Sequence, residues 1–113
     1  MAWTNWRLLA DRSSWYSDLF DHVGPACYEL SIAGPRGGNR TITYCGHTVN
    51  EKARLSNYGR DGSHLATIIV RHLRQGWFLY YRARACTTKD KAEAMERRML
   101  DKYDYPWNIL LNN

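Results

Sequence analysis

Residues 26–46 have the sequence ACYELSIAGPRGGNRTITYCG, and this stretch decides the fold. Its two ends, 26–33 and 40–46, are rich in apolar, β-branched and aromatic residues, which favour β-strands. The segment between them, 34–39, has the glycines and the proline of a turn. Tyr28 and Leu30 would lie on one face of the first strand and Glu29 on the other, because side chains alternate along a strand. We therefore expect a β-hairpin.

Three helices and one more strand are expected after the hairpin. The apolar spacing and the start and stop residues predict helices at 50–59, at 63–76 and from Thr87 or Thr88 to about 103, the last ended by Pro106. Residues 77–85 have the composition of a third strand. The order is ββααβα, which predicts an α+β fold with a small three-stranded antiparallel sheet flanked by helices.

The segment before the hairpin has a different pattern. Apolar residues between 3 and 20, among them Trp6, Leu9 and Trp15, recur at a loosely helical spacing. We expect one or two short helices there. The predicted organisation is an N-terminal helical appendage at 1–23 and a main domain at 24–113.

The charge of the chain is unevenly distributed. At 113 residues it is one domain with a formal net charge of +5. From Lys52 to Lys102 there are 12 basic and 5 acidic residues, a net charge of +7, whereas the rest has 4 basic and 6 acidic residues, a net charge of −2. This polarity favours a phosphate-rich partner. The alternative is a surface that only keeps the protein soluble.

The cysteines and histidines indicate no metal cluster or disulfide framework. Cys27, Cys45 and Cys86 are odd in number and have no C-x-x-C spacing. The four histidines have no metal-ligand spacing, and His72 falls on the apolar stripe of its predicted helix. With no signal peptide and no apolar run near ~18 residues, we expect an intracellular, cytoplasmic protein without a membrane partner.

Glu96 is the most informative single residue. On the last predicted helix it shares a face with Ala92, Met99, Leu100 and Tyr103. A carboxylate in an apolar stripe is costly to desolvate unless something offsets its charge. A divalent cation would do so, since Mg²⁺ is often held by one or two carboxylates with water and phosphate. The alternative is a Glu at the rim, paired with a neighbouring Arg.

Three other residues have both a structural and a chemical interpretation. Arg54, in the middle of a short helix, could bind a phosphate in bidentate fashion or be an ordinary surface arginine. Tyr28 and Tyr44 lie on paired strands, where tyrosines usually serve packing.

Taken in chain order, these residues resemble the motifs of the GIY-YIG nuclease family. Ala26-Cys27-Tyr28 is similar to the GIY element, and Tyr44-Cys45-Gly46 is similar to the YIG element. The family's arginine, eight residues after the glycine, falls on Arg54. Its glutamate falls on Glu96 and its asparagine on Asn108. The resemblance covers roughly residues 24–108.

The chain departs from the family pattern at several points. Its first motif has neither the glycine nor the isoleucine, and the loop between the motifs is longer than usual. The position four residues after the arginine, often histidine in homing-type members, is Tyr58, as in certain restriction-enzyme members. This departure concerns the identity of the general base.

The resemblance implies a metal-dependent endonuclease that hydrolyses phosphodiester bonds of DNA. A single Mg²⁺ or Mn²⁺ ion would be bound by Glu96, Arg54 would bind the phosphate, and Tyr28 or its rival Tyr58 would take the proton from water. Tyr44 would orient water or phosphate. Gly46 and Asn108 would support the site, Asn108 by bracing the C-terminal segment.

Binding would come from phosphate contacts by basic residues. The candidates are Lys52, Arg60, Arg71, Arg74, Lys89, Lys91, Arg97 and Arg98. No helix-turn-helix, zinc finger or second domain is evident, so specificity is expected to be low, structure-based, or supplied by a homodimer or a partner protein. The aromatic N-terminal segment could provide a dimer contact or an added nucleic-acid surface, or simply pack on the domain.

Three classes of function stay open. The first is the endonuclease. The second is a non-catalytic nucleic-acid-binding module on the same fold, and the third is an interaction protein with no nucleic-acid role. RNA stays open as an alternative to DNA, and the small size would suit a phage or mobile element.

Overall fold

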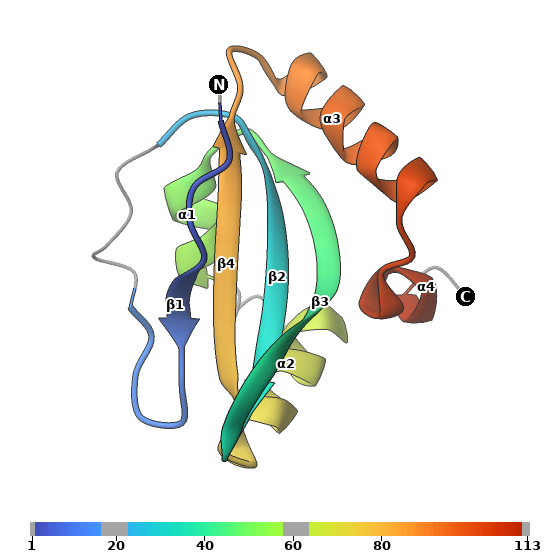
Figure 1. The fold of residues 1–113 in the computed structure, drawn as a ribbon. Coiled ribbons are helices and arrows are strands. Elements are labelled where there is room, and N and C mark those ends of the chain that lie inside the picture. The colour runs from blue at the N-terminus through green and yellow to red at the C-terminus, as the bar shows by residue number, and fades with distance from the viewer. Residues whose placement is uncertain (1, 17–22, 58–63, 112–113) are drawn as a thin grey trace.

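The computed structural model describes residues 2–16, 23–57 and 64–111 (Figure 1). The strands are β1 (Arg7–Ala10), β2 (Ala26–Gly34), β3 (Gly37–Thr48) and β4 (Phe78–Ala85), and the helices are α1 (Glu51–Asn57), α2 (His64–Arg74), α3 (Lys89–Lys102) and α4 (Pro106–Leu111). The predicted α+β class is therefore confirmed, and the predicted ββααβα order runs from β2 to α3.

The strands form one antiparallel sheet in the order β1-β4-β2-β3. β2 pairs with β3 through the predicted hairpin and with β4 on its other side. In Figure 1, α1 and α2 lie behind this sheet, whereas α3 and α4 lie along β3. None of the described helices is long and apolar enough to cross a membrane.

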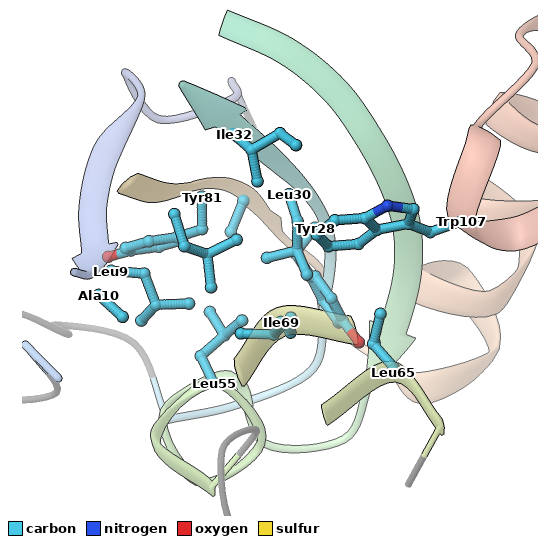
Figure 2. Close-up of a cluster of buried hydrophobic side chains, with 12 residues drawn as sticks. Leu9, Ala10, Tyr28, Leu30, Ile32, Leu55, Leu65, Ile69, Tyr81 and Trp107 are labelled. Atoms are coloured by element: carbon cyan, nitrogen blue, oxygen red, sulfur yellow. The ribbon is translucent and has the colours of Figure 1, made fainter. Parts of the chain in front are cut away.

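The two faces of β2 contribute to two separate apolar clusters. Tyr28 and Leu30 point into the larger cluster, with Leu55 of α1 and Ile69 of α2 (Figure 2). Cys27 points the other way, into a smaller cluster that α3 covers. The alternation predicted from the sequence is thus confirmed.

The helix ends follow from local chemistry. The Asn50 side chain accepts a hydrogen bond from the Ala53 N–H at 3.1 Å at the start of α1, and the Thr88 hydroxyl accepts one from the Lys91 N–H at 3.2 Å at the start of α3. Gly76 follows α2 with a φ of +89°, a conformation that favours glycine. Pro106 does not merely end the preceding helix, because it is the first residue of α4.

The helical prediction for the N-terminal segment was wrong where the structure describes that segment. Residues 7–10 form β1 and pair with β4, so the sheet has four strands rather than three. Leu9 and Ala10 are fully buried in the larger cluster, and the Trp15 indole N–H donates to the Leu55 carbonyl of α1 at 2.9 Å. Hydrogen bonds to the edge of β4 hold these residues in a strand despite their weakly helical spacing. A strand of this length shows little alternation of its own, so the sequence pattern did not reveal it.

Truncation of Leu9 tests whether β1 belongs to the core. Leu9→Ala should lower the free energy of unfolding by about 2–5 kcal/mol, because it leaves a cavity at a fully buried position. Leu110→Ala is the matched control, since Leu110 is 59% exposed and should change the stability by less than about 0.5 kcal/mol. Urea unfolding followed by tryptophan fluorescence measures both. Equal effects would contradict the assignment of β1 to the core.

Candidate functional site

Tyr28 and Gly46 face each other across β2 and β3. A Cβ atom on residue 46 would lie 2.6 Å from the Tyr28 hydroxyl and 2.9 Å from Cε2 of Tyr44. The two rings therefore occupy the space that any side chain at position 46 would need. Their centroids are 6.2 Å apart with the planes inclined by 35°. Glycine at this position is what brings the two tyrosines together.

The Tyr28 phenol is held in its neutral form. Its side chain is 1% exposed, and burial raises its pKa well above the usual range. The nearby Tyr44 raises this pKa further. The Arg54 guanidinium lowers it through its charge and a hydrogen bond, but burial outweighs both effects. Tyr28 is therefore a hydrogen-bond donor at neutral pH.

Two opposite charges act on the Tyr44 phenol. Burial is the main cause that raises the pKa of its phenol, and the negative charge of Glu96 raises it as well. The positive charge of Arg54 acts in the opposite direction. Arg54 from α1 and Glu96 from α3 thus act on the same pair of phenols, which places all four residues around one site.

Glu96 has a partner that the sequence did not reveal. The imidazole Nδ1 of His47 is hydrogen-bonded to a carboxylate oxygen of Glu96, and their side chains are 26% and 19% exposed. His47 follows Gly46 on β3, so alternation turns its side chain towards α3. That alternation was the available signal. The alternative of a Glu96–Arg pair is not seen in the described part of the chain, where Arg97 instead pairs with Glu93 at 3.5 Å.

Asn108 joins α4 to the edge of the sheet. Its carboxamide oxygen accepts from the Cys45 N–H at 2.8 Å, and its amide N–H donates to the Cys45 carbonyl at 2.9 Å. The side chain takes the place of a neighbouring strand on β3, which is an edge strand. These bonds fix the backbone of β3 at Cys45, between Tyr44 and Gly46.

The predicted phosphate-binding residues do not gather in one place. They form two groups on different sides of the sheet, one on α1 and α2 and the other on α3. All of the described members are exposed: Lys52, Arg71, Arg74, Lys89, Lys91, Arg97 and Arg98. Lys91 and Arg98 line a pocket of about 360 Å³ together with Arg84. Arg60 and Tyr58 lie outside the described residues.

The donor set at Glu96 limits the kind of metal that it could hold. No group of three or more His, Cys, Asp or Glu side chains in the described ranges could enclose a metal ion. Within the same ranges, the second carboxylate oxygen of Glu96 has no hydrogen-bond partner. One partly exposed carboxylate fits Mg²⁺ held mainly by water and substrate phosphate, but it does not fit an all-protein cage.

Comparison with known proteins identifies the family of the chain. The chain matches the family profile described as "GIY-YIG domain-containing protein" over residues 2–75 and 66–113. The chain belongs to the GIY-YIG family. The resemblance predicted from its motifs is thereby confirmed, and with it a nuclease superfamily whose domains interact with nucleic acid.

One curated relative adds a biological context. The GIY-YIG chain is 34% identical over 136 aligned residues to "Protein EFFECTOR OF TRANSCRIPTION 3" of Arabidopsis thaliana. The alignment covers 99% of this chain and 52% of that protein, so the chain spans about half the length of the relative. No solved structure matches the chain.

Adding one methyl group at position 46 tests the packing of the tyrosines. Gly46→Ala should lower the free energy of unfolding by about 1–3 kcal/mol, because its Cβ would overlap the Tyr28 ring. Gly34→Ala is the control, since a Cβ at that position meets its nearest atoms at 3.9 Å. Urea unfolding curves compare the two variants. A Gly46→Ala protein as stable as the Gly34→Ala protein would rule out this arrangement of Tyr28.

Proposed function

We propose that this GIY-YIG domain is an endonuclease that hydrolyses phosphodiester bonds of DNA with a divalent metal ion. The observation that carries the proposal is the meeting of Tyr28, Tyr44, Arg54 and Glu96, which come from the hairpin, α1 and α3. A guanidinium and a carboxylate beside two neutral phenols offer a site for a phosphate and a cation. Specificity would be low or dependent on DNA structure.

Arg54 and Glu96 would bind groups of opposite charge, the phosphate and the metal ion. The Arg54 guanidinium would bind the phosphate and stabilise the charge that develops on it. Glu96 would hold Mg²⁺ or Mn²⁺, with the His47 imidazole fixing the orientation of the carboxylate. When bound, such an ion supplies a Lewis acid for the phosphate and the leaving oxygen.

We assign Tyr28 to hydrogen-bond donation rather than to proton abstraction. A general base must be deprotonated at the working pH, and a pKa raised well above the usual range works against this. A neutral phenol can instead donate to a phosphate oxygen or to the attacking water. Tyr58, the other candidate for the base, belongs to the undescribed part of the chain.

A second candidate function is nucleic-acid binding without cleavage. The name of the Arabidopsis relative describes an effector of transcription, and a domain serving such a role could bind DNA and leave it intact. The two candidates differ in whether the metal-dependent reaction at Glu96 takes place, so that residue decides between them.

Substitution of Glu96 tests the proposed reaction. Wild-type protein should nick or linearise supercoiled plasmid in Mg²⁺ or Mn²⁺ and should stop when EDTA is added. Glu96→Gln keeps the shape of the side chain but removes its charge, so cleavage should fall by at least about 10²–10³-fold while binding of duplex DNA survives. Agarose gels and gel shifts measure the two properties.

The matched control is Glu93→Gln on the same helix. Glu93 is paired with Arg97 on the exposed side, so its loss should leave cleavage unchanged. If wild-type protein binds duplex DNA but leaves plasmid intact with either metal, the non-catalytic function is correct. If Glu96→Gln cuts as fast as wild type, Glu96 is not the metal ligand.

The pH dependence of cleavage tests the role of Tyr28. Tyr28→Phe should cut about 10²–10³-fold more slowly at pH 7, with a pH–rate profile of the same shape from roughly pH 6 to 9. A base with a raised pKa would make the wild-type rate climb with pH over this whole range. Loss of such a climb in Tyr28→Phe would show that Tyr28 is the base. Ionisation of Tyr28 should not change the stability of the wild-type protein over this pH range. The pKa of Tyr28 is raised in the folded state, so its contribution to stability is complete below the ordinary tyrosine pKa of about 10 and is lost only above it.

A further inference from the structure

Aromatic and arginine side chains alternate on the face of the sheet that lies opposite α1 and α2. The Arg82 guanidinium lies 5.1 Å from the ring centre of Trp3 and 4.8 Å from that of Trp6. The Arg40 guanidinium lies 5.7 Å from the Trp6 ring and 5.1 Å from the Tyr80 ring. We call the series Trp3, Arg82, Trp6, Arg40 and Tyr80 the Trp–Arg ladder. It joins the segment before β1 to β3 and β4.

Two pockets flank the Trp–Arg ladder. One of about 510 Å³ has Trp3, Tyr103 and Tyr105 among its walls, and one of about 450 Å³ has Trp6 and Arg40. Ile42, 38% exposed, lines both pockets, so that the surface is continuous. The larger pocket has the volume of a small-molecule site.

The ladder is fixed from beneath by a buried carboxylate. The Arg82 side chain donates to Oε1 of Glu29 at 2.6 Å, and the Tyr105 hydroxyl donates to Oε2 at 2.5 Å. Glu29 is 2% exposed, and its charge is offset by Arg82. The Arg82 guanidinium is therefore held in place against the Trp3 and Trp6 rings before any ligand arrives.

Beside the Arg82–Glu29 pair, this surface has two cations, Arg40 and Lys102, and one anion, Asp104 of the larger pocket, so its remaining net charge is positive. Arg40 is exposed, and Lys102 lines the larger pocket with its ammonium 5.4 Å from the Tyr103 ring centre. Neither cation has a carboxylate within salt-bridge distance among the residues that the structure describes. Rings for stacking, with cations beside them, are what proteins use to bind single strands.

We propose that the Trp–Arg ladder and its two pockets bind single-stranded nucleic acid. Bases would stack on the exposed Tyr103 ring and on the partly exposed rings of the ladder, and phosphates would lie near Arg40 and Lys102. Duplex DNA would not engage this surface in the same way, because its bases are already stacked on one another. The inference rests on nucleic acid as the partner of the domain, which the proposed function shares, and does not depend on cleavage.

The position of the surface relates it to the candidate site. Met99 of α3 and Tyr103, the residue that follows α3, line the larger pocket, and Glu96 lies three residues before Met99 on the same helix, a separation of about one turn. A strand bound along the ladder would thus be directed towards the helix that carries the carboxylate. A second copy of the chain is a weaker occupant, since its own Arg40 and Lys102 would add like charges to the interface.

Fluorescence anisotropy tests the proposal with a labelled oligothymidine of about 15 nucleotides and a labelled duplex of equal length. Tyr103→Ala and Arg40→Gln should each raise the Kd for the single strand by about fivefold or more, and should change the Kd for the duplex by less than about twofold. Tyr103 is 48% exposed, so its truncation should leave the fold intact, which circular dichroism checks.

Two control variants match these changes. Arg12→Gln removes the same charge from an exposed position outside the ladder, and Ile109→Ala shortens a side chain that is 52% exposed on α4. Both should bind the oligothymidine as wild type does.

Several outcomes would overturn the proposal. One is equal loss of single-strand and duplex affinity in Tyr103→Ala and Arg40→Gln, or no loss at all. Another is a wild-type dimer in sedimentation velocity that Tyr103→Ala dissociates, which would assign the surface to a second copy. Plasmid cleavage without oligothymidine binding would refute the ladder and leave the endonuclease standing. Failure to bind either nucleic acid would refute the partner that both proposals share.

Discussion

The overlap of the Tyr28 ring with residue 46 is the constraint on which the site depends. The ring of Tyr28 occupies the space above Gly46, and the Tyr44 ring closes the same space from the side. Any slip of one residue between β2 and β3 would place a side chain under the Tyr28 ring and turn every side chain of the strand to the other face. Tyr28 therefore sets the register of the hairpin as well as the centre of the site.

From this point the site extends through both layers of the fold. Gly46 and His47 are neighbours on β3, and alternation directs one residue towards the tyrosines and the other towards α3. Glu96 can thus raise the pKa of Tyr44 while it is hydrogen-bonded to His47. An edge strand normally leaves backbone groups without partners, but the Asn108 carboxamide satisfies those of Cys45. A site at the edge of a sheet is in this way kept rigid.

The sequence predicted what periodicity and capping determine, and it missed what distant contacts determine. The hairpin, α2 and α3 were predictable because turn residues, an apolar stripe and a capping threonine are local signals. β1 was not, since its four residues depend on the edge of β4, which lies about seventy residues later. Motif order identified Tyr28 and Glu96 as candidates, but neither the burial of Tyr28 nor the His47–Glu96 bond can be inferred from spacing. Their roles in a reaction stay predictions.

The physical cost of the site bears on which function it serves. A nucleic-acid-binding module needs exposed cations and stacking rings, and the Trp–Arg ladder offers both at the surface. Such a module has no need to bury the Tyr28 phenol and half-bury the Tyr44 phenol beside a guanidinium, because polar groups in a core carry a desolvation penalty that apolar side chains avoid. Leucine or phenylalanine could fill much of the space of Tyr28, but neither has a hydroxyl group. The two phenols, on which the charges of Arg54 and Glu96 both act, therefore argue for the proposed reaction over binding alone.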